Sequence, residues 1–175
     1  MTHASVPQSA LFRLSTRICS ALIFALGISA NANIITVTNT NDSGPGSLRQ
    51  ALRAANDGDT ITFAVNGTIA LTSGGLPVNK SVTISGPGKD QLSIDGNQAL
   101  LVFGVFPDKT VTISGLTIRN GQTGIWNENG TLTVNNCAVS GNSEVGLLNG
   151  GVLTVSNCVV SGNSSGIYNT TPCYS

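Results

Sequence analysis

The sequence is poor in charged residues, in aromatic residues and in histidine. Charged residues make up 9% of the 175 residues, and the formal net charge is zero. An average soluble protein has about 25% charged residues. Eight lysines and arginines are too few for a nucleic-acid-binding surface, so DNA and RNA are not expected partners. Aromatic residues make up only 5%, and no apolar run is long enough for a transmembrane helix in the mature protein.

The residues that are abundant favour a β-rich fold. Glycine, asparagine, serine and threonine are all frequent, and hydrophobic residues make up 40% of the chain. Disordered chains are usually charged and poor in valine and isoleucine. This chain is uncharged, rich in β-branched residues and rich in turn-forming residues, which indicates an all-β protein. Its length suits one domain of ordinary size.

The N-terminal segment has the layout of a secretory signal peptide. Arg13 and Arg17 form a basic part, an apolar run covers residues 18–28, and the small residues Ala-Asn-Ala at 30–32 suit cleavage. We therefore predict a signal peptide over residues 1–32. An N-terminal membrane anchor is the alternative, but the apolar run is too short to span a bilayer.

Removal of this segment would also remove His3, which is the single histidine of the chain. Six basic residues and eight acidic residues remain after position 32, giving a net charge of about −2. Without histidine, no Ser-His or Cys-His catalytic pair and no imidazole metal site can form. The sequence therefore predicts no catalytic residues of these types, no metal site and no cofactor.

An internal repeat covers the C-terminal half of the chain. Three segments align without gaps at an offset of 21 residues, and each is followed by a second matching segment. The first set is VTISGLTIRNG from Val111, LTVNNCAVSGN from Leu132 and LTVSNCVVSGN from Leu153. The second set is GIWN from Gly124, GLLN from Gly146 and GIYN from Gly166. Apolar residues alternate within each segment, which predicts short strands with one buried face.

A single residue separates the first two strands of each repeat. It is Gly115, Asn136 or Asn157, and Gly86 is its expected equivalent in an earlier copy with a longer turn. Glycine and asparagine tolerate a left-handed backbone, so each such residue predicts a sharp bend. Three strands per coil of about 21 residues predict a parallel β-helix. An antiparallel β-sandwich explains the strand density but not the fixed offset.

The chain before the repeats predicts a cap for the open end of the core. A strand is expected over residues 34–38, followed by a short helix with Ser47 as N-cap and Gln50 completing a capping box. An apolar stripe of the helix faces the core, and its polar face carries two cations, too few for membrane binding. The predicted organisation is a strand and capping helix over 33–59, β-helix coils over 60–169, and a tail over 170–175.

Two stretches of the chain resemble known β-helix proteins. TVTNTNDSGPGSLRQALRAANDGDTITF resembles the start of secreted bacterial right-handed β-helix proteins, and the GIWN to GIYN stretch resembles pectate-lyase-like β-helix surface proteins. That stretch is also similar to polymorphic outer-membrane-protein repeats of adhesins. The resemblance covers roughly residues 34–169. It implies a right-handed parallel β-helix, and export to the extracellular space, the bacterial cell surface or the outer membrane.

The resemblance does not imply an activity, because one β-helix scaffold hosts lyases, hydrolases, adhesins and structural proteins. Family pectate lyases bind calcium with clustered acids and abstract a proton with arginine or lysine. Asp90, Asp95 and Asp108 come from different turns around one coil and are expected to be solvated, as is Arg119. No catalytic residue is therefore carried over from the family.

The third strand of each coil offers candidate contacts for a carbohydrate or a protein partner. Trp126, Leu148 and Tyr168 form an outward stripe if the preceding isoleucine or leucine points inward, and Glu128 follows Trp126 closely. Aromatic rings on a solenoid face suit sugar stacking. The leucine in the middle weakens a sugar platform, and the stripe could equally contact a neighbouring segment.

Repeated asparagines and cysteines have structural explanations. Asn127, Asn149 and Asn169 recur at one place and Asn136 and Asn157 at another, so stacked amides are expected to form ladders along the axis. Cys137 and Cys158 take the same inward position on adjacent coils. Their expected separation permits a disulfide, but buried reduced thiols are favoured because stacked side chains run parallel.

These observations predict an exported, non-enzymatic β-helix protein that acts as a structural, adhesive or carbohydrate-binding module. Its expected partners are a polysaccharide or a host or cell surface. The alternative is a polysaccharide lyase or glycoside hydrolase of the pectate-lyase-like type. The core after the last coil is expected to be uncovered, so the chain would either self-associate end to end or be a fragment of a longer protein.

Overall fold

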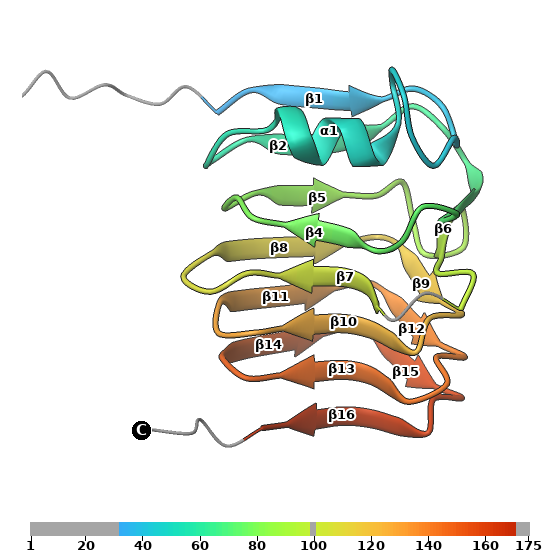
Figure 1. The fold of residues 1–175 in the computed structure, drawn as a ribbon, viewed down its shortest axis with the longest axis vertical. Coiled ribbons are helices and arrows are strands. Elements are labelled where there is room, and N and C mark those ends of the chain that lie inside the picture. Colours follow the sequence, from blue (N-terminus) through green and yellow to red (C-terminus); the bar gives the residue numbers. More distant parts are fainter. Residues whose placement is uncertain (1–31, 99–100, 171–175) are drawn as a thin grey trace, which may run out of the picture.

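The structure is a computed structural model that describes residues 32–98 and 101–170. The chain forms a parallel β-helix of about six turns spaced about 22 residues apart, with one short helix in the described part (Figure 1). The predicted all-β solenoid is confirmed. Three parallel sheets run along its axis, and neighbouring strands in each sheet come from successive coils.

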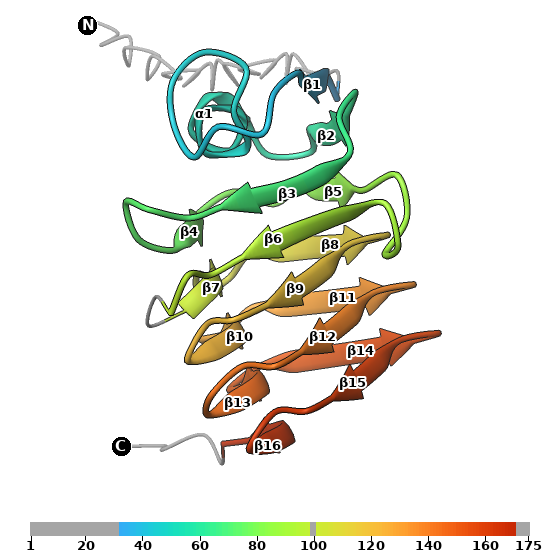
Figure 2. The same cartoon turned by 90° about the vertical axis from the view of Figure 1, so that its right-hand side faces the viewer.

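The three sheets together surround the core, and sheet A has one strand more than each of the other two. Sheet A has six strands: β1 (Ile34–Val37), β2 (Thr60–Phe63), β5 (Thr83–Ser85), β8 (Thr110–Ser114), β11 (Thr131–Asn135) and β14 (Val152–Ser156). Sheet B has five strands: β3 (Gly67–Ala70), β6 (Leu92–Asp95), β9 (Thr117–Arg119), β12 (Ala138–Ser140) and β15 (Val159–Ser161). Sheet C has five strands: β4 (Leu76–Val78), β7 (Leu101–Val105), β10 (Thr123–Asn127), β13 (Val145–Asn149) and β16 (Ser165–Asn169). Sheet B faces the viewer in Figure 2.

The register of the later coils follows the sequence repeat. Leu132 of β11 pairs with Leu153 of β14, as the aligned segments predict. In sheet C, Ile125 pairs with Leu147 and Leu147 with Ile167, again as in the matched GIWN, GLLN and GIYN segments. Equivalent residues therefore stack along the axis about 4.8 Å apart.

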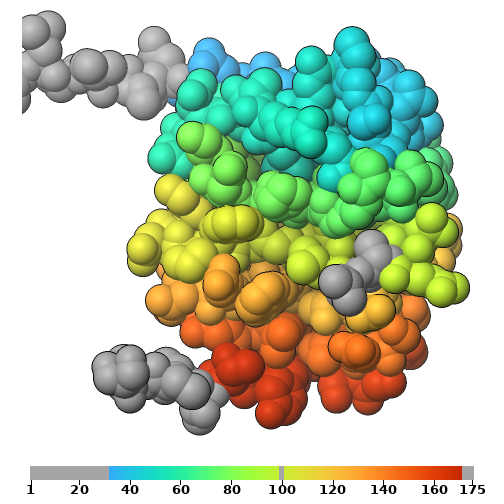
Figure 3. Space-filling view, in the orientation of Figure 1, coloured from blue at the N-terminus to red at the C-terminus, as the bar shows by residue number. Residues whose placement is uncertain are grey.

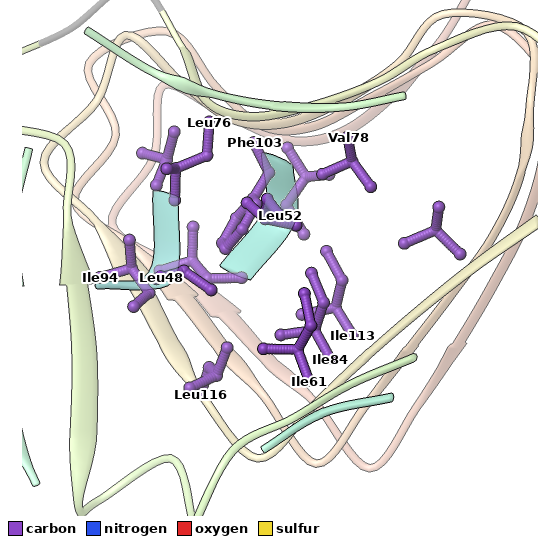
Figure 4. Packing of buried hydrophobic residues seen from close by; sticks show 14 of the residues in the cluster. Leu48, Leu52, Ile61, Leu76, Val78, Ile84, Ile94, Phe103, Ile113 and Leu116 are labelled. Carbon is purple, nitrogen blue, oxygen red and sulfur yellow. The ribbon is translucent and has the colours of Figure 1, made fainter. Parts of the chain in front are cut away.

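The core is a set of stacked aliphatic rows that the three sheets close around (Figure 4). Ile61, Ile84 and Ile113 form a row from sheet A and are fully buried. Phe103 of sheet C and Ile94 of sheet B face the same interior and are also fully buried. Burial of each such side chain stabilises the fold by roughly 1.5–3 kcal/mol relative to exposure.

Helix α1 (Leu48–Ala54) covers the core at the N-terminal end. Ser47 is its N-cap and accepts a hydrogen bond from the Gln50 amide at 3.2 Å. The Gln50 side chain accepts from Gly46 at 2.9 Å rather than from Ser47, so the predicted capping box closes one residue earlier. Leu48 and Leu52 are buried, and the helix lies beyond β4 in line with sheet C (Figure 1).

The bends between sheets A and B have the predicted left-handed backbone at three of four positions. The φ angles are 64° at Gly115, 52° at Asn136 and 53° at Asn157. Gly86 has no positive φ, so that part of the prediction is wrong. Residues 86–91 take the place of the single Gly115, and a side chain at Gly86 would collide with the Gly115 carbonyl oxygen. Close packing, not backbone handedness, requires glycine there.

The last described coil carries an apolar face with nothing packed against it within residues 32–98 and 101–170. Leu153 and Val155 are half-buried, whereas their partners Leu132 and Val134 in the preceding coil are buried. Ile167 is 45% exposed, although Leu147 beside it is 1% exposed. Among the described strands, none pairs with the outer edges of β14, β15 and β16.

The predicted signal peptide lies almost wholly outside the described residues, and residues 171–175 of the predicted tail lie outside them too. Among the helices of the described part, none has the length and apolar character to cross a membrane.

Candidate functional site

A row of outward residues crosses sheet C. Trp126 of β10 pairs in register with Gly104 of β7 on one side and with Leu148 of β13 on the other. Pro77 of β4 and Tyr168 of β16 extend the row in both directions. The residues before Trp126 and Leu148, Ile125 and Leu147, are buried in the core. Trp126 is therefore directed outward and is 37% exposed, and Tyr168 is 55% exposed.

A groove of about 510 Å³ lies beside Trp126 on this face. Figure 3 views the molecule from this side. The groove is lined by Gly74, Gly75, Pro77, Leu101, Gly104, Val105, Phe106, Trp126 and Glu128. Gly104 forms part of the floor, and a Cβ atom there would approach the Leu101 side chain to 3.0 Å. The groove exists because glycine occupies the row position next to Trp126.

The groove has little charge. Glu128, which follows β10 and is exposed, is the single ionisable residue among those that line it. The five strands of sheet C contain no charged residue. Glu128 therefore gives the groove one hydrogen-bond acceptor with negative charge at its edge, and no arginine or lysine among the described lining residues balances that charge.

A buried ion pair holds one wall of the groove. Arg49 of α1 is 6% exposed, and its guanidinium donates to the carbonyl oxygens of Gly75 at 2.6 Å and Gly74 at 2.5 Å. It also donates to the Asp42 carboxylate at 2.6 Å. The second carboxylate oxygen of Asp42 accepts from the Ser73 amide at 2.9 Å. We call these contacts the Arg49–Asp42 clamp.

The clamp changes the acidity of Asp42. Burial raises the pKa of this carboxyl group, but hydrogen bonds from Ser73 and Arg49 and the charge of Arg49 outweigh burial and lower the pKa to about 2. Asp42 is therefore ionised at neutral pH. Arg49 and Arg53 are the two cations predicted on the polar face of α1, yet the structure buries Arg49 against this loop.

The acidic residues considered as a possible catalytic cluster do not converge. Asp90 contacts Lys89 at 3.1 Å on the surface, and Asp108 lies in an exposed turn with φ of 60°. Asp95 contacts Arg119 at 3.2 Å and accepts a hydrogen bond from Asn120 at 2.8 Å. Arg119 is thus paired rather than simply solvated. Across residues 32–98 and 101–170, no three His, Cys, Asp or Glu side chains gather as metal ligands would.

Asparagine ladders link the later coils. Asn127 donates to Asn149 at 2.8 Å, and Asn149 donates to Asn169 at 3.0 Å. Asn127 also bonds both the amide and the carbonyl of Gly130, so it shapes the turn after β10. These amides leave no free polar group for a ligand at the buried Asn127, which is 0% exposed.

The second expected ladder differs from the prediction, and a third was missed. Asn157 donates to Asn135 at 3.5 Å, not to Asn136. The missed ladder joins Asn142 and Asn163 at 2.9 Å, and Asn142 is buried. Its signal in the sequence was the Ser-Gly-Asn that ends the aligned segments from Leu132 and Leu153.

The two cysteines of the later coils are unbonded thiols. The Cys158 sulfur accepts a hydrogen bond from the Cys137 amide at 3.4 Å. Burial raises the pKa of the Cys137 thiol to about 11, and the neighbouring Cys158 adds to this effect. Cys137 therefore acts as a small buried apolar residue, as the sequence predicted.

Comparisons with known proteins give a partial similarity. No protein-family model matches the chain, and no solved structure matches it. The chain is 44% identical over 70 residues to "Probable pectate lyase C" of Aspergillus fumigatus (strain CBS 144.89 / FGSC A1163 / CEA10), which covers 38% of this chain and 16% of that protein. It is 44% identical over 82 residues to "Probable pectate lyase C" of Aspergillus terreus (strain NIH 2624 / FGSC A1156). That alignment covers 42% of this chain and 19% of the relative.

The chain thus spans less than a fifth of the length of these curated relatives. The solenoid of three parallel sheets and the partial similarity point in the same direction. Together they support a pectate-lyase-like parallel β-helix.

Proposed function

We propose that the protein is an exported β-helix module that binds a polysaccharide in the groove beside Trp126 and does not cleave it. The observation that carries this proposal is the exposed indole of Trp126 at the edge of an apolar groove with Gly104 in its floor. Sugar rings have apolar faces that stack on aromatic rings, and a groove with few polar groups suits such contacts.

The arrangement of polar groups supports binding without cleavage. Cleavage by a lyase needs a base, and glycoside hydrolysis needs a pair of carboxyl groups flanking the scissile bond. Glu128 is the one ionisable residue among those that line the groove. Asp90, Asp95 and Asp108 lie outside the groove lining, and the first two are paired with basic side chains.

A polysaccharide lyase is the second candidate, because the curated relatives carry the name pectate lyase. The two candidates differ in one measurement. A lyase would release unsaturated products from polygalacturonate in the presence of calcium, and a binding module would release none.

The proposal is tested by affinity electrophoresis of the secreted protein in gels that contain neutral or acidic polysaccharides. We expect retardation by at least one polysaccharide, and loss of retardation in Trp126→Ala. The matched control is Val159→Ala, which removes an exposed side chain from sheet B. No retardation in any gel, or equal retardation of both variants, would contradict binding at this groove.

Export is part of the proposal and follows from the predicted signal peptide. Surface attachment is also part of the proposal, and it is what the resemblance to β-helix surface proteins implies. An adhesive role would use the same groove, with a cell-surface glycan as the ligand. A structural role would use instead the uncovered face of the last coil, through end-to-end association of two chains.

A further inference from the structure

We infer that the ligand of the groove is an uncharged, extended glycan chain that lies along the solenoid axis and contacts both Trp126 and Tyr168. This inference rests on the proposed function, since it names the glycan class and the direction of binding. It differs from the substrate class in the relatives' name, because pectate is acidic.

The charge of the face argues against an acidic glycan. The strands of sheet C contain no charged residue. Glu128 directly follows β10 and Glu144 directly precedes β13, and both side chains are exposed. A polyuronate would meet negative charge with no lysine or arginine among the groove residues to balance it. Such like-charge contacts discriminate against a wrong ligand.

The hydroxyl groups of a neutral glycan meet a more suitable surface. Glu128 can accept hydrogen bonds from sugar hydroxyls, because an ionised carboxylate has two acceptor oxygens. The apolar groove wall includes Phe106, which is 45% exposed, and Pro77, which is also exposed. These residues and Trp126 offer apolar contact to the faces of the sugar rings.

The spacing of the aromatic residues gives the direction of the ligand. Trp126 pairs with Leu148, and Leu148 pairs with Tyr168, so the two rings stand two strands apart. Two strand spacings amount to about 9–10 Å. The rise per sugar of an extended β-1,4-linked chain is close to one strand spacing, so alternate sugars of such a chain can face Trp126 and Tyr168. Leu148 between them provides an apolar contact for the intermediate sugar.

The test is isothermal titration calorimetry of the secreted chain with defined oligosaccharides. The neutral probes are cellohexaose, xylohexaose, mannohexaose and their disaccharides, and the acidic probe is hexagalacturonate with and without millimolar calcium. We expect a neutral hexasaccharide to bind and hexagalacturonate to bind at least tenfold more weakly. Trp126→Ala should lower the affinity for the neutral hexasaccharide at least tenfold, which corresponds to about 1.4 kcal/mol.

Two further variants test the direction and the charge argument. Tyr168→Ala should lower the hexasaccharide affinity about threefold to tenfold and leave the disaccharide affinity unchanged, because a disaccharide that stacks on Trp126 reaches Leu148 but not Tyr168. Tyr168→Phe should retain most of the affinity. Glu128→Gln should raise the affinity for hexagalacturonate, because it removes the repelling charge.

The outcomes separate the inference from the proposed function. Binding of hexagalacturonate alone, lost in Trp126→Ala, would overturn the inference and leave polysaccharide binding in place. Equal hexasaccharide affinity of Tyr168→Ala and the unaltered protein would overturn the axial direction. Absence of binding to every glycan here and in the electrophoresis gels would overturn both.

Discussion

The Arg49–Asp42 clamp makes a measurable contribution to stability that depends on pH. Asp42→Asn removes the negative charge and leaves the shape of the side chain nearly unchanged. Arg49 would then remain buried, with the carbonyl oxygens of Gly74 and Gly75 as its main partners. Removal of one partner of a buried ion pair costs about 3–5 kcal/mol. Since the carbonyl contacts persist, we expect a loss of about 2–4 kcal/mol in the free energy of unfolding at pH 7.

The pH dependence has a defined sign. The pKa of Asp42 is lowered from 3.8 to about 2, and its side chain is 9% exposed. The ionised form is therefore favoured by folding, and its contribution is present above pH 4 and is lost as the pH falls through 2. With allowance for solvent screening, this shift is worth about 1–2 kcal/mol. Because asparagine does not titrate, the difference between the two proteins should shrink between pH 4 and pH 2.

Urea unfolding followed by circular dichroism at pH 7, 4 and 2.5 checks this reasoning. Asp90→Asn is the matched control, because it removes a carboxylate from an exposed pair in which Asp90 is 87% exposed. It should stay within about 0.5 kcal/mol of the unaltered protein at pH 7. If both variants lose the same stability, or if the Asp42→Asn difference stays constant as the pH falls, the clamp does not stabilise the fold as argued.

The bend at Asn136, the two cysteines, export and the last coil can each be tested directly. Asn136→Val should lower the free energy of unfolding by about 1–3 kcal/mol, and Asn136→Gly should be tolerated, because a β-branched residue resists the left-handed backbone. Equal loss of stability in the two variants, measured by thermal or urea unfolding, would contradict this account of the bend. Iodoacetamide should modify Cys158 before Cys137, because burial and the raised pKa of Cys137 suppress its thiolate. Mass spectrometry of the peptides measures the order, and earlier modification of Cys137 would contradict this prediction. Mass spectrometry of protein recovered from the medium should find an N-terminus at or near Asn33, and retention of residues 1–32 would contradict export. A polypeptide with this sequence should dimerise or aggregate through the exposed face around Ile167, whereas a concentrated monomer in light scattering would contradict that expectation.

The part of the fold that repeats could be predicted from sequence in detail. The aligned segments from Val111 onward gave the strand pairs of β8, β11 and β14 residue by residue. This success has a physical cause, since each coil buries the same inward positions against the coil before it. The helix at Ser47 was also predictable, because capping and the apolar stripe are local signals.

The groove and the clamp could not be predicted, because both depend on contacts between non-repeating segments. Gly104 lies in β7, which has no match to the GIWN pattern, so its pairing with Trp126 left no signal in the sequence. Arg49 stands on the polar face of a helix, and its carbonyl partners lie much later in the chain, in an irregular loop. Nothing in local periodicity indicates that this arginine is buried.

The register of β11 with β14 has a consequence for the possible length of the protein. Because each coil touches mainly the coils before and after it, a duplicated copy of residues 131–151 would find the same neighbours as the original. Each duplication would add one strand to every sheet and lengthen the molecule by about 4.8 Å. It would also add one more Leu148 to the outward row of sheet C. Gain or loss of whole coils would therefore change the length of the solenoid in fixed steps, while the inward residues of every remaining coil keep the same contacts.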